Sequence, residues 1–361
     1  MARKAPPRRR GGGRPGGAPA RRRNRRHARE AGVPAVSSRA GATAGMPATR
    51  RPRPRPHKPA EPLRYGVPVA LRATLYTDPA CPWAYSATPA LTVLRWRYRD
   101  QLDWRLVTIG LREEAGPPAS SGGYTPARQA AGSRRFRDRF GMPITAAPRP
   151  RPVATARACR AVVATRLAHP GREFAVLRAL AFAWFNSTLL LDEDEAIAAA
   201  LAGVEGIDAA ALVAALDSDA VAEAYAADRA QARSAAGGAT EFQGKAAVSD
   251  GLVRYTAPSV VFEAADGRRL EAGGFQPLEA YDVLIANLDT SLERFAPPES
   301  GPLELLEHFP AGLCTQEVAA LLAGNLVDTD RPGAEDALLE LVAEGRARRE
   351  PLGDDAIWRA A

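Results

Sequence analysis

The sequence predicts an α/β fold in which a long helical block separates two parts of one domain, with a smaller unit after it. Three observations predict this. A buried strand, a helix and a second strand follow one another from about residue 71. Strand character then disappears for over a hundred residues. It returns near residue 257 as a hairpin followed by a final helix.

The first part is a strand–helix–strand unit. Residues 72–77 are β-favouring and stop at Asp78-Pro79, which predicts a buried strand. Apolar residues then recur at helical spacing over 86–99, and residues 102–109 alternate as a second strand closed by Gly110. At this length the connection predicts a βαβ unit with parallel strands.

The helical block covers residues 112–244, where Ala-rich patterns are separated by Gly and Pro. We predict helices over 126–140, 153–167, 172–186, 192–201, 208–216 and 220–235. Beyond the block, residues 257–262 and 269–272 predict two strands joined at the turn Asp266-Gly267. A helix over about 277–288 follows Gly273-Gly274.

Residues 301–361 form a separate unit after Ala296-Pro297-Pro298. We predict helices over 303–309, 317–322 and 335–344, and short strands over 346–350 and 356–359 around the turn Gly353-Asp354. Three helices followed by a hairpin is a winged-helix-like layout. The third helix would read DNA in such a module, but its acids (Glu335, Asp336, Glu340 and Glu344) would repel phosphates. A protein-interaction or dimer-packing role is the favoured interpretation, and a homodimer stays open.

Residues 1–62 form a basic segment rich in Arg and Pro. Residues 1–60 hold 18 of the 49 Lys and Arg residues and a single acid, Glu30, so the remainder of the chain is mildly acidic. Because the segment has almost no apolar side chains to bury, we predict that it is a disordered tail. Any contact with nucleic acid is expected to be non-specific and made by this tail. The alternatives to a tail that contacts nucleic acid are a merely solvated tail, or a true start at Met46 or a nearby codon.

Several classes of protein do not fit the sequence. The three cysteines (Cys81, Cys159 and Cys314) are too few and too scattered for a disulfide framework. The four histidines lie apart from them and from each other, so no metal site is expected. There is no long apolar run for a membrane span and no apolar stretch of a signal peptide. We therefore expect a cytoplasmic protein that does not associate with membranes.

The string from Asp78 to Tyr85 (Asp-Pro-Ala-Cys-Pro-Trp-Ala-Tyr), between a strand and a helix, resembles the active-site turn of the DsbA-like thioredoxin superfamily. That superfamily includes the FrnE-like predicted dithiol-disulfide isomerases, mycothiol-dependent oxidoreductases, kappa-class glutathione transferases and 2-hydroxychromene-2-carboxylate isomerases. The helical block matches their insertion, and the step Ala257-Pro258 matches their cis-proline. The resemblance implies a thioredoxin-like domain over 63–111 and 245–295, with 112–244 inserted.

The resemblance makes Cys81 the catalytic residue, and implies that Pro82, Trp83, Tyr85, Ala257 and Pro258 bind a substrate or thiol. It also implies a cis peptide bond before Pro258. Physical chemistry points to the same cysteine. Backbone N–H groups at the first turn of a helix favour a thiolate there, and Pro82 fits an early helical position.

This chain departs from the family pattern because Ala84 replaces the second cysteine of the C-x-x-C motif. A mixed disulfide at Cys81 would then be resolved by an external thiol such as mycothiol or glutathione, or by Cys159 if the fold brings it close. We therefore predict a single-cysteine (monothiol) thiol-disulfide oxidoreductase or isomerase acting on small-molecule or protein thiols and disulfides, with no tightly bound cofactor. The alternative is a non-catalytic thioredoxin fold that binds or regulates through its C-terminal module.

Overall fold

The computed structural model describes residues 71–116 and 123–361, and the predicted disordered tail over 1–62 lies outside them. The described residues fall within one compact unit. In these two ranges no helix has the length and apolar character needed to cross a bilayer. The same ranges contain no group of three or more His, Cys, Asp or Glu residues arranged to hold a metal ion.

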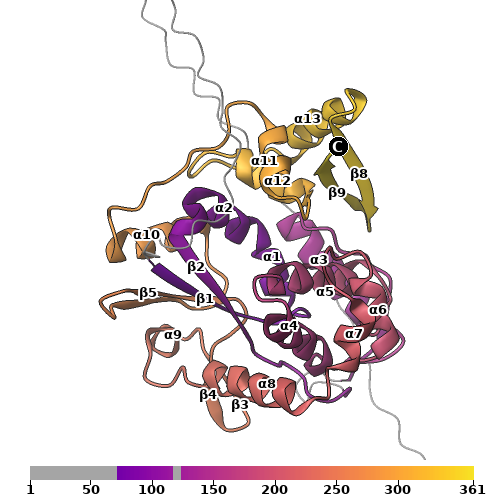
Figure 1. Cartoon of the computed structure of the whole chain (residues 1–361), viewed down its shortest axis with the longest axis vertical. Helices are drawn as coiled ribbons and strands as arrows, with labels where there is room; N and C mark the ends of the chain where they lie inside the picture. Colours follow the sequence, from indigo (N-terminus) through magenta and orange to yellow (C-terminus); the bar gives the residue numbers. More distant parts are fainter. Residues whose placement is uncertain (1–70, 117–122) are drawn as a thin grey trace, which may run out of the picture. The chain divides into compact units, whose positions relative to one another are not determined.

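The central sheet has four strands in the order β2-β1-β5-β6 (Figure 1). These strands are β1 (Leu71–Thr77), β2 (Leu102–Thr108), β5 (Ser259–Ala264) and β6 (Arg269–Ala272). β1 pairs with β2 in parallel and with β5 in antiparallel orientation, so the two parts of the domain meet at β1. The predicted strands, and the parallel pairing of the first two, are confirmed.

Two helices, rather than one, follow β1. α1 (Pro82–Ser86) is only five residues long, and α2 (Thr88–Tyr98) starts again after Ala87. Each has a proline in its first turn, where the missing N–H is not needed. Pro89 thus begins a new helix, and the prediction of a single helix over 86–99 is wrong at its start.

The block between the strands contains all six predicted helices. They are α3 (Pro126–Phe140), α4 (Ala156–Ala168), α5 (Glu173–Asn186), α6 (Asp194–Leu201), α7 (Ala209–Ala214) and α8 (Asp219–Ala232). The prediction missed α9 (Ala239–Phe242) and the hairpin of β3 (Ala247–Ser249) and β4 (Leu252–Arg254). In this hairpin Val248 and Leu252 are exposed, so it lacks the alternation by which strands are recognised.

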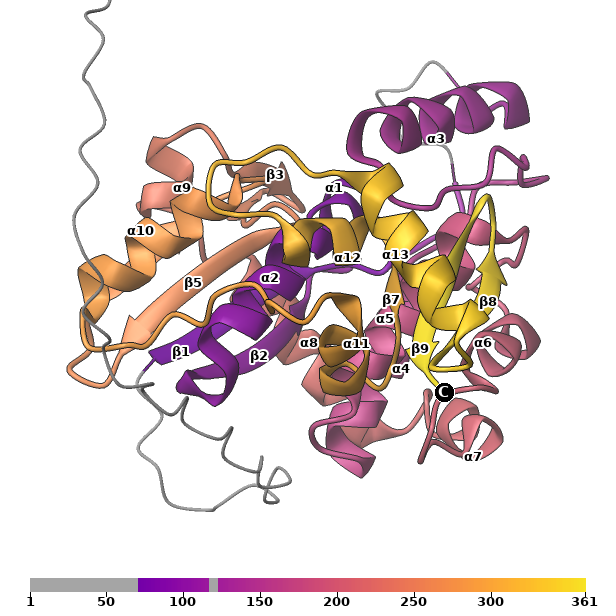
Figure 2. The same cartoon turned by 90° about the horizontal axis from the view of Figure 1, so that it is seen from above.

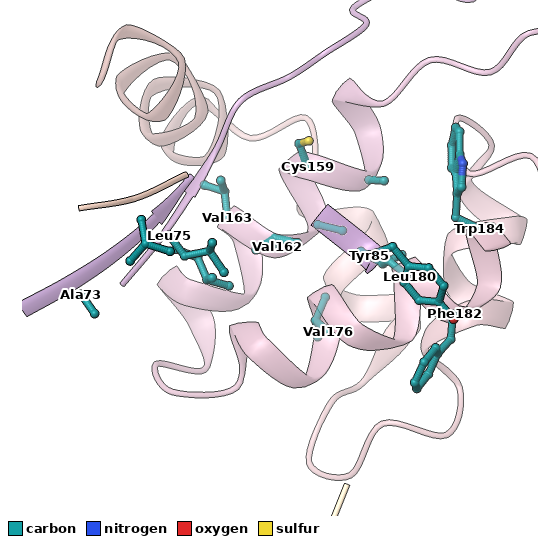
Figure 3. Packing of buried hydrophobic residues seen from close by; sticks show 14 of the residues in the cluster. Ala73, Leu75, Tyr85, Cys159, Val162, Val163, Val176, Leu180, Phe182 and Trp184 are labelled. Atoms are coloured by element: carbon teal, nitrogen blue, oxygen red, sulfur yellow. The ribbon is translucent and has the colours of Figure 1, made fainter. Parts of the chain in front are cut away.

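The main core lies where α4 and α5 pack against each other beside β1. Figure 3 places Leu75 of β1 near Val162 and Val163 of α4, with Val176 and Leu180 of α5 beyond them. α10 (Leu278–Leu288) contacts β5, β6 and α2, whereas α8 contacts β2. α3 has no buried residue and lies above α1 in Figure 2.

The C-terminal residues form a second sheet with its own core. The elements are α11 (Pro302–His308), β7 (Leu313–Cys314), α12 (Thr315–Leu322), α13 (Arg331–Ala343), β8 (Ala347–Leu352) and β9 (Asp355–Ala360), and the sheet order is β7-β9-β8. The predicted three helices and hairpin are present, and β7 is additional. Trp358 and Leu338 are fully buried in a cluster that also includes Val93 and Trp96 of α2. This unit therefore shares part of its core with the larger domain.

Candidate active site

Cys81 lies at the N-cap position of α1, immediately after the turn that ends β1. The backbone N–H of Cys81 donates to the carbonyl oxygen of Asp78 at 3.0 Å, and the N–H of Tyr85 donates to the Cys81 carbonyl at 2.9 Å. These bonds fix the turn and the first turn of the helix. The side chain is 6% exposed, so only a small part of the thiol meets solvent.

A segment from the far end of the domain meets Cys81. The peptide bond between Ala257 and Pro258 is cis, as the sequence analysis predicted. The Cys81 Sγ donates to the carbonyl oxygen of Ala257 at 3.2 Å. The structure thus brings together the predicted catalytic cysteine and the predicted proline step, which come from opposite sides of the helical block.

Burial decides the protonation of the cysteine. The pKa of the Cys81 thiol is raised to about 12, mainly by desolvation and to a smaller extent by the negative charge of Asp78. The backbone amides of Ala84 and Trp83 and the charge of Arg254 lower the pKa, but by less. α1 is too short for a full helix dipole, which is in any case a modest effect. The expected thiolate is therefore not found, and Cys81 is a neutral thiol at pH 7.

Asp78 anchors the active-site turn, a role that the sequence analysis did not assign. Its carboxylate accepts from the N–H of Ala80 and of Leu111, each at 2.9 Å, and from the Thr155 hydroxyl at 2.9 Å. Burial nevertheless raises the pKa of this carboxyl. A signal was present in the sequence, because an Asp that accepts from the residue two positions later forms an Asx turn.

Trp83 belongs to an aromatic cluster on the surface next to Cys81. Its ring centroid lies 5.0 Å from that of Phe136, 5.7 Å from Phe140 and 5.6 Å from Phe275. The Trp83 side chain remains 40% exposed. It therefore attaches α3 to α1, and part of the side chain stays open to solvent.

Tyr85 points into the core instead. Its ring stacks on Phe185 at 4.3 Å, and its hydroxyl donates to the carbonyl oxygen of Pro143 at 2.8 Å. Asn186 donates to the same hydroxyl at 3.2 Å. Figure 3 shows Tyr85 beside Leu180, on the side of α1 that faces α5. Tyr85 and Cys81 lie in different apolar clusters, so the predicted ligand contact of Tyr85 gains no support from the geometry.

All three cysteines are free and buried. The Sγ of Cys159 donates to the Asp78 carboxylate at 3.4 Å, and burial raises the pKa of this thiol strongly. Cys314 lies at the start of α12, where its N–H donates to Glu317 at 2.9 Å. Cys159 packs in the main core rather than in the cluster around Cys81, and the two thiols are not bonded to each other.

Comparison with known proteins gives a family model and several related structures. The model of the DSBA-like thioredoxin domain matches residues 73–237. The chain is similar, at 18% identity, to a candidate protein disulfide isomerase from Nitrosomonas europaea, covering 60% of this chain and 97% of that one with a TM-score of 0.47. It is also similar, at 18% identity, to the cytosolic disulfide reductase DsbM from Pseudomonas aeruginosa, covering 61% and 100% with a TM-score of 0.43. No curated protein matches this sequence.

Proposed function

Because residues 73–237 form a DSBA-like thioredoxin domain, we propose that this chain exchanges thiols and disulfides through a single cysteine, Cys81. The observation that supports this most is the 3.2 Å contact between the Cys81 Sγ and the carbonyl oxygen of Ala257, beside the cis bond to Pro258. A ligand at this step would lie against the sulfur.

The proposed exchange has two steps. The Cys81 thiol loses its proton to solvent and attacks a disulfide R–S–S–R′, forming a mixed disulfide with R–S and releasing R′–S⁻. A second thiolate R″–S⁻ then attacks the R sulfur, forming R–S–S–R″ and returning the Cys81 thiolate. Ala84 offers no internal thiol for the second step. We propose that an external low-molecular-weight thiol, glutathione or mycothiol, carries out the second step. Because such thiols are used in the cytoplasm, we also propose a cytoplasmic location.

A second candidate is a non-catalytic thioredoxin fold that acts as a binding or regulatory protein. The burial of Cys81 and its pKa of about 12 favour this candidate, because few molecules carry the nucleophilic thiolate at neutral pH. Binding would then involve the C-terminal residues 301–361, for which we propose a winged-helix-like module. Acidic side chains on α13 favour a protein partner or a second copy of this chain over DNA.

Trapping the mixed disulfide separates the two candidates. The protein is incubated with glutathione disulfide at pH 7 and pH 9 and its intact mass is measured, with Cys81→Ser as the control. Exchange predicts one added glutathione on the wild-type protein, formed faster at pH 9, and none on Cys81→Ser. An unmodified wild-type protein at both pH values, with its fold intact, favours the binding candidate.

A further inference from the structure

A cavity opens next to the active-site turn. Ala80 and Pro82, the two neighbours of Cys81 in sequence, line one part of it, and Trp184 and Phe185 at the end of α5 line another. Its volume is about 1080 Å³, including the solvent at its mouth. That is the size of a site for a small organic molecule.

The lining of this cavity is positively charged. Arg112, Arg128, Arg149 and Arg151 contribute to it, and no Asp or Glu is among the described residues that do. Arg151 is neutralised, because its guanidinium donates to Asp192 at 2.6 Å and to Glu193 at 2.7 Å. Arg112 and Arg149 therefore contribute unneutralised positive charge to the cavity wall.

Arg149 is the unusual member of this set. It is 6% exposed, and its guanidinium lies over the Trp184 ring, 4.6 Å from the centroid. Its Nε donates to the carbonyl oxygen of Leu189 at 3.3 Å. Within residues 71–116 and 123–361, neither Nη atom has a hydrogen-bond partner and no carboxylate pairs with the charge. Burial lowers the pKa of Arg149 to about 10, so the side chain still carries its charge at pH 7.

Comparable arginines elsewhere in the fold are paired. Arg97 forms an ion pair with Asp282, and Arg233 pairs with Asp250 at 2.9 Å. The side chains of Arg97 and Arg233 are 5% and 7% exposed, close to the 6% exposure of Arg149. A buried charge without a partner is costly, so the exception at Arg149 points to an anion supplied from outside the chain.

We propose that this cavity binds the carboxylate of a small-molecule thiol, with Arg149 and Arg112 as the anion-binding residues. Arg112 lines the same cavity and donates from Nη1 to the carbonyl oxygen of Val153 at 3.0 Å, without an ion pair among the described residues. A guanidinium binds a carboxylate through parallel N–H bonds. Pro82 is part of the wall, so a ligand held here lies next to the turn that carries Cys81.

This inference selects between the two co-substrates. Glutathione carries two carboxylates, whereas mycothiol carries no charged group, so the cavity favours glutathione or another carboxylate-bearing thiol. This choice of co-substrate rests on the thiol exchange proposed above. The binding of an anion at Arg149 does not, and it can be measured without any reaction at Cys81.

The binding experiment uses S-methylglutathione, which keeps both carboxylates but cannot exchange disulfides. Calorimetric titration of the full chain is compared with titration by the diethyl ester of the same compound, which lacks both negative charges. We expect the ester to bind at least tenfold more weakly. Inorganic phosphate serves as a second probe, and the expected result is that it competes only weakly, because a free anion lacks contact with the cavity's apolar walls.

Two substitutions identify the residues. Arg149→Gln and Arg112→Gln are each expected to weaken S-methylglutathione binding at least tenfold. Arg135→Gln is the matched control, since it removes the same charge from an exposed position of α3, and it should leave affinity unchanged. If Arg149→Gln does not fold, Arg112→Gln and the ester comparison on the wild-type protein still test the site.

The proposal would be overturned by no binding of S-methylglutathione at millimolar concentration, by equal binding of the ester, or by full affinity in both arginine variants. Phosphate competition as strong as that of S-methylglutathione would also overturn it, by showing a simple anion site. Failure of the exchange reaction is a separate outcome. Binding that depends on Arg149 in a protein that forms no mixed disulfide retains the anion site and rejects the catalytic role of Cys81.

Discussion

Arg178 of α5 and Glu317 of α12 form a buried ion pair between the helical block and the C-terminal unit. The guanidinium donates to the two carboxylate oxygens at 2.7 and 2.5 Å. Thr92 of α2 donates to the same carboxylate at 2.9 Å. Glu317 is fully buried, and the charge of Arg178 helps to hold its pKa below the usual value, although burial opposes this. The ion pair, together with the hydrogen bond from Thr92, thus joins α5, α12 and α2.

Removing one partner of this pair should destabilise the protein strongly. Glu317→Ala leaves the Arg178 charge buried without a partner, which costs about 3–5 kcal/mol. The double variant Arg178→Met/Glu317→Leu should lose less than Glu317→Ala, because it leaves no charge behind. Urea denaturation of the three proteins checks this. A double variant at least as unstable as Glu317→Ala would contradict it.

Acid should weaken the same contact. The pKa of Glu317 is lower in the folded chain than its ordinary value of 4.5, so its stabilisation is fully present above about pH 4.5. It is lost as the pH falls through the folded pKa. Unfolding free energy measured from pH 6 to pH 3 should drop more steeply in the wild type than in the double variant.

Alkylation of Cys81 should be slow at pH 7 and accelerate well above pH 9. Its thiol has a pKa of about 12 in the folded protein, so the thiolate fraction rises over that whole range. Iodoacetamide labelling followed by mass spectrometry measures this, with Cys81→Ser as the control. A plateau in the labelling rate below pH 8 would be the contrary result.

Asp78→Asn should lower the pKa of Cys81. The Asp78 charge is one of the two causes that raise this pKa, and the amide removes it. Labelling at pH 8 should therefore be faster than in the wild type. Some stability is expected to be lost, about 1–3 kcal/mol, because an amide nitrogen cannot accept the bonds that Asp78 accepts from Leu111 and Thr155. Near-ultraviolet circular dichroism would confirm that the fold survives.

Trp83→Ala should loosen α3. This helix has no buried residue, and Phe136 and Phe140 attach it to Trp83. We expect trypsin to cleave within α3 at least several-fold faster, while global unfolding changes by only about 1 kcal/mol per lost ring pair. Trp83→Phe retains a ring and should restore much of the protection. Equal cleavage rates in all three proteins would show that other contacts hold the helix.

Local signals allowed most elements to be predicted. The stop at Asp78-Pro79 marked the end of β1, and the turn Asp266-Gly267 marked the hairpin of β5 and β6. The cis bond at Pro258 came from the resemblance to a family, since nothing local distinguishes it from other prolines. The exposed hairpin of β3 and β4 had no apolar alternation and was missed.

The state of the cysteine could not be predicted in the same way. Cys81 is buried by Ala232, Tyr255 and Ala257, which lie more than 150 positions away along the chain. The sequence around residue 81 indicates only a helix N-terminus, which favours a thiolate. Burial by these distant residues raises the pKa of the thiol and so favours its protonated form instead. Arg149 was missed for a similar reason, because its lack of a carboxylate partner appears only when the chain is folded.

The contact between Cys81 and Ala257 cannot form until both residues have been synthesised. The two residues are 176 positions apart, and ribosomes add about 5–20 residues per second, so roughly 9–35 s separate their synthesis. During this interval the newly made cysteine has no carbonyl partner and titrates as an ordinary thiol with a pKa of about 8.5. Oxidants and alkylating agents therefore reach this residue most easily while the polypeptide is still being translated, before the finished protein encloses it.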